Sequence, residues 1–470
     1  MLRVVLAANV DGAAKPLASP DYSVYHTRQG VFDDLAEMAR SCPDVLEISS
    51  YTRTVNGSYS STIQIVEVTP RESKDTPAHV LRRHLWNFGQ HGREMVTTEL
   101  ALYVLSVLCA DSEESIPDLV SSSSWPSAAS VRRVLAGSRL WLVPMDNEQG
   151  RRAVERGALC ERRNGRGVDP NRNYSVDWGV KEPDYDPKEE FPGTAPFSEP
   201  EAMLMLELAQ RIRPHVWINV HSGMEGLFLP FDHVSNSPNG AEAAESDITL
   251  AALRRLNQGV LSSRCVVGPG GKSVGYLAHG TATDFMHASL GVPVALTWEI
   301  FGDIGAAYED CFRTFNPLTS DQLKAVLRKW AIALLGTVEL FFDHPAVLEA
   351  GPAGFARFCD AKGDLDAPRA ANHTSLGRRA DGGKAEKLPS STSPGQSSDA
   401  DASFRAFFAA PQPPAGDVSR GGAAACRRRV GRPPPNLPRV MGKGVWPLHW
   451  TAASPSPSGG AWRSGSVLAW

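Results

Sequence analysis

The 470 residues are enough for one large domain or about two to three smaller ones, and 42% hydrophobic with 21% charged residues is ordinary for a globular protein. The 48 Lys and Arg residues against 52 Asp and Glu residues give a formal net charge of -4, which excludes a chain-wide electrostatic footprint for nucleic acid or an anionic membrane. No apolar run approaches the roughly 20 residues that cross a bilayer, so we predict no membrane span.

Neither the cysteines nor the N-terminus identifies the compartment. The seven cysteines are few for this length, odd in number and never in C-x-x-C spacing. This excludes a cysteine zinc site and a dense disulfide framework, and leaves one or two bridges open. The apolar run over residues 4–8 is too short for the core of a signal peptide. We therefore interpret residues 1–21 as an N-terminal extension or the remnant of a signal peptide.

The rest of the chain divides into a folded part and a tail. From 22 to 347, apolar runs alternate with longer amphipathic stretches, whereas 43 of the last 120 residues (351–470) are Gly, Pro or Ser. Segments such as PQPPAG and SPSPSGG cannot bury enough apolar surface to offset chain entropy. We therefore predict one folded domain over residues 22–347 and a disordered tail rich in Gly, Pro, Ser and Arg over residues 348–470.

The predicted elements of the folded part alternate between strands and helices. A helix over residues 31–39 precedes two strands, LEISSY and STIQIVEV, which are joined by a turn at residues 55–58. Four later runs are typical of short strands: HLWNFG, SRLWLVPMD, HVWINV and VPVALTWEI. Helical spacing appears between them, over residues 96–107 and 203–212. This order predicts an α/β fold with a mixed, largely parallel sheet, whose ligands lie beyond the carboxyl ends of the strands.

Candidate metal ligands follow two of these strands. His91 and Glu94 come after HLWNFG within HGRE, and His221 comes directly after HVWINV. Two histidines and one glutamate are a catalytic zinc set that leaves a fourth position open for water. A bare H-x-x-E pair is weak evidence, however, because its usual explanation is a solvated helix start with a capping carboxylate.

The neighbouring motifs are more specific. The chain reads NFGQHGREMVTTEL around Glu94, G-V-D-x-N-R-N at 167–173, G-T-x-P-F-S-E-P-E at 193–201 and H-S at 221–222, and an apolar strand carries Glu299. In these motifs, residues 22 to about 340 resemble the M14 zinc carboxypeptidases, the family of pancreatic carboxypeptidase A. The resemblance implies a three-layer α/β/α sandwich that binds one zinc ion and hydrolyses the C-terminal bond of peptides or proteins. We expect a monomer, and the family favours an extracellular or secretory location.

The resemblance also implies roles near the metal. It makes His91, Glu94 and His221 the zinc ligands, in agreement with their chemistry. It makes Asp169 a carboxylate that orients a zinc-binding histidine, and the alternative for Asp169 is turn capping. An acid in a strand as apolar as VPVALTWEI needs a reason. Glu299 matches the catalytic base, which removes a proton from a zinc-activated water, and the alternative is a buried ion pair.

Arginines and an asparagine match the substrate-binding residues of the family. A planar guanidinium suits a free carboxylate, and Arg172 beside Asn171 matches the clamp for the substrate C-terminus. Arg162 matches the arginine that polarises the scissile carbonyl. A solvated basic loop is the alternative for Arg162, since further arginines lie nearby. Arg93 is a candidate contact for residues further along the peptide.

The closing loop and the specificity pocket are predicted on fewer matches. Tyr276, in a glycine-rich segment, matches a mobile tyrosine that closes over the bound C-terminus, and the alternative is a plain surface tyrosine. Members specific for Lys or Arg place an acid at the pocket floor, where this chain aligns Thr283, and Thr297 also aligns with a pocket position. We therefore predict a neutral pocket that prefers apolar or aromatic C-terminal residues. Gly223 stands where pancreatic relatives carry a tyrosine, and activation by propeptide cleavage is not expected.

Two alternative functions remain open from the sequence. The same zinc, glutamate and arginine set would serve a related zinc amidohydrolase acting on acylated amino acids. A catalytically silent binding protein on the same fold is the other alternative. Such proteins usually lack the base or a ligand, whereas His91, Glu94, His221 and Glu299 are all present in this sequence.

Overall fold

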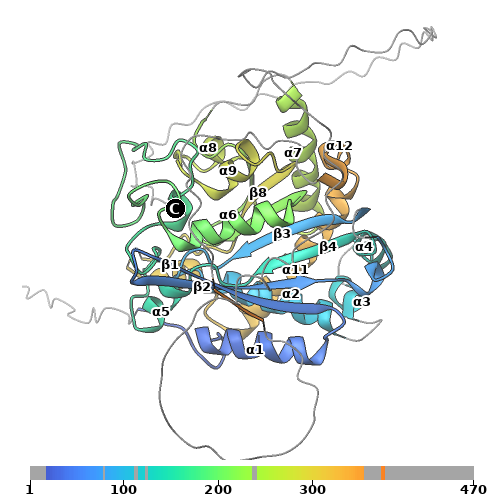
Figure 1. The fold of residues 1–470 in the computed structure, drawn as a ribbon, viewed down its shortest axis with the longest axis horizontal. Coiled ribbons are helices and arrows are strands. Elements are labelled where there is room, and N and C mark those ends of the chain that lie inside the picture. The colour runs from blue at the N-terminus through green and yellow to red at the C-terminus, as the bar shows by residue number, and fades with distance from the viewer. Residues whose placement is uncertain are drawn as a thin grey trace, which may run out of the picture. The chain divides into compact units, whose positions relative to one another are not determined.

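A single mixed sheet organises the computed structural model, which describes residues 17–77, 80–110, 115–121, 125–235, 241–307, 309–353 and 372–375 (Figure 1). Within these segments nine strands follow the order β7-β6-β8-β5-β3-β4-β2-β1-β9. The strands are β1 (Leu46–Val55), β2 (Tyr59–Val68), β3 (Arg82–Phe88), β4 (Ser138–Val143), β5 (Val216–His221), β6 (Glu225–Leu229), β7 (Val266–Pro269), β8 (Val294–Ile300) and β9 (Asn372–Ser375).

Parallel pairing is concentrated in the middle of this sheet. The strands β4, β3, β5 and β8 are parallel to one another, and so are β6 and β7. The pairs β9–β1, β1–β2, β2–β4 and β8–β6 are antiparallel. The predicted α/β fold with a mixed sheet is confirmed, although parallel pairs do not outnumber antiparallel ones. The carboxyl ends of the four central strands meet at one edge.

Helices cover both faces of the sheet (Figure 1). The helices α1 (Arg28–Ser41), α2 (Met95–Cys109), α4 (Ala128–Leu135) and α11 (Ser320–Phe342) pack on one face, and α6 (Pro200–Ile212) and α9 (Ala282–Ala288) pack on the other. The remaining helices are α3 (Ser115–Val120), α5 (Glu148–Glu155), α7 (Ala241–Gly259), α8 (Gly270–Ser273), α10 (Cys311–Phe315) and α12 (Pro345–Ala350), with 3-10 turns η1 (Arg71–Ser73), η3 (Pro170–Arg172) and η4 (Gly351–Ala353).

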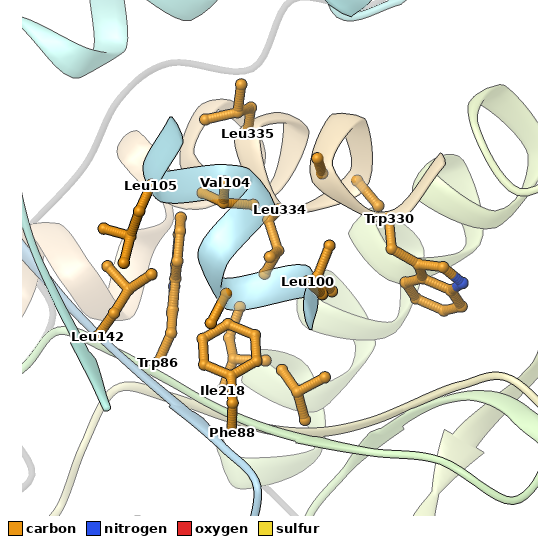
Figure 2. Close-up of a cluster of buried hydrophobic side chains, with 14 of the residues drawn as sticks. Trp86, Phe88, Leu100, Val104, Leu105, Leu142, Ile218, Trp330, Leu334 and Leu335 are labelled. Atoms are coloured by element: carbon orange, nitrogen blue, oxygen red, sulfur yellow. The ribbon is translucent and has the colours of Figure 1, made fainter. Parts of the chain in front are cut away.

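Alternation along the central strands separates two hydrophobic cores. In β3, Leu85 belongs to the core under α6 and α9, whereas Trp86 and Phe88 belong to the core under α2 and α11. Figure 2 shows Trp86 and Phe88 in one buried cluster with Leu100 of α2 and Leu334 of α11. Each fully buried side chain of this kind contributes about 1.5 to 3 kcal/mol. Two cores on opposite faces make the predicted three-layer sandwich.

Several features lay outside the predicted elements. The short strands β6 and β7 were not predicted. The predicted boundary at residue 347 falls inside α12, and β9 pairs with β1 within the predicted tail. Residues 1–16, most of the predicted N-terminal extension, and nearly all of the tail lie outside the described residues. No helix of the described segments is long and apolar enough to cross a membrane.

Two disulfide bridges join distant parts of the chain. Cys42 bonds to Cys109 and links the ends of α1 and α2. Cys160 bonds to Cys311 across 151 residues and links the loop that carries Arg162 to the start of α10. Both bridges lie within the one or two that the cysteine count left open, and the buried Cys265 is a free thiol.

Candidate active site

The candidate metal ligands meet at the carboxyl edge of the central strands. His221 is the last residue of β5 and pairs in register with Glu299 on β8. His91 and Glu94 lie in the turn between β3 and α2. Gly92 makes this turn possible, since a Cβ atom there would lie 2.5 Å from the carbonyl group of Gly150. Strand order and one tight turn therefore bring three polar side chains from distant sequence positions to one place.

Donor atoms from these three residues converge there. His91 Nδ1 lies 2.7 Å from Glu94 Oε1 and 3.1 Å from His221 Nδ1, and His221 Nδ1 lies 3.0 Å from Glu94 Oε2. The three residues are each 2% exposed, and one ligand atom from each lies within 4.8 Å of the others. Burial opposes ionisation of Glu94, but the two histidines hold the pKa of its carboxyl below its ordinary value. Two imidazole nitrogens and a carboxylate facing one point fit a zinc ion.

Asp169 supports this cluster from behind. Its Oδ1 lies 3.1 Å from His91 Nε2, its Oδ2 accepts a hydrogen bond of 2.8 Å from Arg162 Nε, and its Oδ1 also accepts from the backbone N–H of Asn171. The orienting contact and the turn-capping contact therefore both exist. Burial opposes ionisation of Asp169, but Arg162 and His91 hold the pKa of its carboxyl well below its ordinary value.

A cavity opens beside the cluster. Most of the predicted site residues lie in its wall: His91, Arg162, Asn171, Arg172, His221, Tyr276, Thr297 and Glu299. The rest of the wall consists of Met224, Phe228, Asp232, Gly270, Val274, Ala278 and Thr281. Burial raises the pKa of Glu299 well above its ordinary value, and the neighbouring Glu94 adds to the shift.

Two predicted substrate-binding residues do not line this cavity. Arg93 is buried, and its Nη1 lies 2.7 Å from Glu189 Oε2 while its guanidinium stacks 4.3 Å from the ring centre of Phe315. Thr283 lies behind the wall, where its hydroxyl is 2.7 Å from that of Thr297. The structure therefore places Thr297, not Thr283, at the surface of the pocket. Alignment by spacing along α9 could not show this, because Thr297 comes from β8 and only the packing of α9 on that strand places it in front of Thr283.

Sequence reasoning missed the acid of the pocket. Asp232 follows β6, and its Oδ2 accepts a hydrogen bond of 2.8 Å from the hydroxyl of Thr281. Gly270 leaves room for this carboxylate, since a Cβ atom at that position would fall within van der Waals radius of Asp232 Oδ1. Burial raises the pKa of Asp232 to about 7, and the neighbouring Asp284 adds to the shift. The available signal was an acid directly after the apolar run GLFLPF, which was not predicted as a strand.

The family is shown by a direct comparison. A family model described as zinc carboxypeptidase, Peptidase_M14, matches residues 32–325, which is more than half of the chain. The chain belongs to the zinc carboxypeptidase family. This confirms the resemblance seen in the sequence motifs. The family is zinc-dependent, which agrees with the donor set formed by His91, Glu94 and His221.

Individual relatives of this carboxypeptidase chain are distant. A zinc carboxypeptidase of Simulium vittatum is 22% identical over 292 residues, covering 59% of this chain and 85% of the relative. Carboxypeptidase A6 of Homo sapiens is 22% identical over 303 residues, covering 61% of this chain and 62% of the relative. The match thus spans less than two thirds of the human protein.

Solved structures support the carboxypeptidase fold. Carboxypeptidase A of Helicoverpa armigera gives a TM-score of 0.52 at 19% identity and covers 71% of this chain and 78% of its own. Thrombin-activatable fibrinolysis inhibitor gives a TM-score of 0.53 at 17% identity and covers 70% of this chain and 77% of its own. At these sequence identities, the structural similarity establishes the fold only, and substrate preference has to be inferred from the residues of the site.

Proposed function

We propose that the chain is a zinc-dependent metallocarboxypeptidase that hydrolyses the C-terminal peptide bond of peptides or proteins. One observation supports this proposal. The wall of a single cavity contains the two histidines of the candidate metal site, Glu299, and the two arginines Arg162 and Arg172. His91, Glu94 and His221 would hold the zinc ion. When bound there, zinc supplies Lewis-acid polarisation of the scissile carbonyl and activation of water.

Glu299 would act as the general base. It lies on the cavity wall beside His221 on the neighbouring strand, so a water molecule approaching the cluster would come within reach of its carboxylate. Its raised pKa makes it a better proton acceptor than an exposed glutamate. The same carboxyl group would then return the proton to the leaving amine.

Arg162 would stabilise negative charge on the carbonyl oxygen. Asp169 holds its Nε, and its Nη1 lies 3.3 Å from His91 Nδ1, which places the guanidinium next to the metal cluster. A donor fixed in this way costs no reorganisation when charge develops on the oxygen. The position is therefore suited to an oxyanion contact.

Arg172, Asn171 and Tyr276 would hold the free C-terminal carboxylate. Asn171 is oriented by a 2.9 Å hydrogen bond that its Oδ1 accepts from the backbone N–H of Ala282, and all three side chains reach the cavity wall. Charge-assisted hydrogen bonds to a carboxylate are short and strong, and an arginine fork supplies them in fixed geometry. This clamp would select exopeptidase cleavage.

The clamp predicts that C-terminally amidated peptides are poor substrates. Each charge-assisted hydrogen bond contributes about 1.5 to 3 kcal/mol, so an amide should lower kcat/KM by roughly 10- to 100-fold. Arg172→Ala should narrow the gap between free-acid and amidated peptides, as measured by release of the C-terminal residue from matched pairs. Equal rates for both forms in the unaltered protein would favour the amidohydrolase alternative. Zinc binding without cleavage of any peptide would favour the silent binding protein.

The wall residues also revise the predicted side-chain preference. We propose that the pocket receives Lys or Arg rather than an apolar residue, because Asp232 lies in its wall. Apolar neighbours that would pack along the aliphatic stem of such a side chain are Met224, Phe228, Val274 and Ala278. A buried carboxylate whose pKa is raised to about 7 would be stabilised in its charged form by a cation entering the pocket.

Replacing Asp232 by Asn tests this preference. Removing one partner of a buried charge pair costs about 2 to 5 kcal/mol, so kcat/KM for a peptide ending in Arg should fall at least about 30-fold. The rate for the matched peptide ending in Leu should hold or rise, since the pocket keeps its shape. A wild-type preference for Leu or Phe over Arg and Lys would contradict the proposal and restore the apolar prediction.

The same carboxyl group predicts a pH dependence. Burial and the neighbouring Asp284 raise the pKa of Asp232 to about 7, while Thr281, Arg172 and His233 lower it. Its carboxyl group is therefore mostly ionised above pH 7 and mostly neutral below it. The ratio of kcat/KM for Arg-terminated to Leu-terminated peptides should therefore fall as the pH decreases from about 8 to about 5.5, because kcat/KM reports ionisation of the free enzyme. Comparing the two peptides at each pH cancels ionisations that affect catalysis in general. In Asp232→Asn, the ratio should be flat over this range.

A further inference from the structure

An acidic segment at residues 177–190 contacts basic groups around the active site. Glu190 Oε1 accepts a hydrogen bond of 2.6 Å from Arg172 Nη2, Glu189 pairs with Arg93, and Glu182 Oε1 lies 2.8 Å from His279 Nε2. Of these contacts, the one to Arg172 involves the guanidinium that we assign to the carboxylate clamp.

Arg172 stands between two cavities. It lies in the wall of the active-site cavity and also in the wall of a second cavity. Glu190 lines only the second cavity, together with Tyr185, Leu277 and His279. Glu190 therefore approaches the guanidinium from the side away from the active-site cavity. It does not occupy the wall at which a substrate carboxylate would bind.

The contact between these residues is well sheltered. The side chains of Arg172 and Glu190 are 6% and 11% exposed, so solvent screens their interaction weakly. A second hydrogen bond of 3.1 Å joins Arg172 Nη1 to the carbonyl oxygen of Asn171, and Asp169 Oδ2 lies 3.9 Å from Nη1. Burial opposes the charge of Arg172, but Asp169 and Glu190 raise its pKa, which keeps the guanidinium ionised.

An arginine without such supports loses rotamer freedom when it binds a ligand. That loss of conformational entropy weakens binding unless the side chain is already ordered. Glu190 contacts one terminal nitrogen from the second cavity, while the guanidinium also lies in the wall of the active-site cavity, where a substrate carboxylate would meet it. Preorganisation of this kind strengthens ligand binding without touching the ligand.

We propose that Glu190 is a positioning residue that preorganises Arg172 for the C-terminal carboxylate of the substrate. The proposal rests on the proposed carboxypeptidase function. It assigns Glu190 a role in binding and none in the chemical step, so its loss should change KM and leave kcat nearly unaltered.

The test measures KM and kcat with a free-acid peptide and its amidated partner. Glu190→Ala should raise KM for the free acid roughly tenfold, with kcat within about twofold of wild type, and should leave the amidated peptide unaffected. Glu190→Gln keeps an acceptor oxygen at the same place and should bring KM back to within about threefold of wild type. Asp184→Asn removes a charge from an exposed position of the same segment and should change neither constant.

A double-mutant cycle separates action through Arg172 from a general structural effect. In an Arg172→Ala background, Glu190→Ala should have no further effect on KM, because the residue that it positions is absent. An equal rise of KM in both backgrounds, an unchanged KM in Glu190→Ala, or a fall in kcat as large as the rise in KM would overturn the proposal. If the wild-type protein shows no preference for free-acid peptides, the proposed clamp fails, which is a result distinct from these.

Discussion

Replacing Glu299 by Gln is expected to lower kcat by about two to four orders of magnitude while leaving zinc bound, since this is the range that a positioned general base contributes. The amide has the shape of the carboxylate and cannot accept a proton from water. Glu299 lies next to His221 in the sheet but is not part of the cluster of donor atoms that would hold the metal. The substitution should therefore separate catalysis from metal binding.

The measurement is steady-state kinetics with a free-acid peptide, together with zinc content and the midpoint of thermal unfolding. KM should change little if Glu299 acts in the chemical step alone. The midpoint of thermal unfolding should stay close to that of wild type, since glutamine keeps the size and shape of the glutamate side chain in β8. A reduction in kcat below about tenfold would assign the base to another residue.

The parts of the site that the sequence predicted share one property. His221 and Glu299 lie at the carboxyl ends of strongly apolar strands, and the turn with His91 and Glu94 follows the apolar strand β3. The hydrophobic pattern therefore located both the strands and the polar residues that end or follow them. Strand ends in a parallel region meet at one edge, and the approximate site follows from that rule. The family resemblance then supplied Arg162, Arg172 and Tyr276, whose loops have no periodic pattern.

The parts that were missed depend on pairing between distant segments. Asp232 reaches the cavity because β6 pairs antiparallel with β8 and α8 brings Gly270 against the carboxylate. The strand β6 has five residues, which is too short for a pattern of period two to be distinctive. Thr283 was placed by its position in the chain, and only the packing of α9 on β8 shows that Thr297 lies in front of it. The sequence thus located the candidate metal cluster and Glu299 better than the residues of the proposed side-chain pocket.

Replacing His221 by Ala is expected to abolish both metal binding and activity, because two ligands rarely hold zinc where three are needed. The wild-type protein should contain about one zinc ion per chain and lose its peptidase activity with a chelator. The variant should contain almost none under the same purification. Ligand binding to the folded state adds about 4 kcal/mol to stability at a thousandfold excess over Kd, so chelation should also lower the unfolding midpoint of wild type and leave that of His221→Ala unchanged.

His26 provides a matched control for this loss. His26 forms a hydrogen bond with a carboxylate, since its Nδ1 lies 2.6 Å from Glu99 Oε2. It does not line the active-site cavity. His26→Ala should retain the metal and the activity, so a loss seen only in His221→Ala cannot come from removing a histidine in general. Peptidase activity that persists after complete metal removal would contradict zinc dependence. Full zinc content in His221→Ala would show that other side chains complete the site, since His91 and Glu94 alone are one ligand short of a zinc centre.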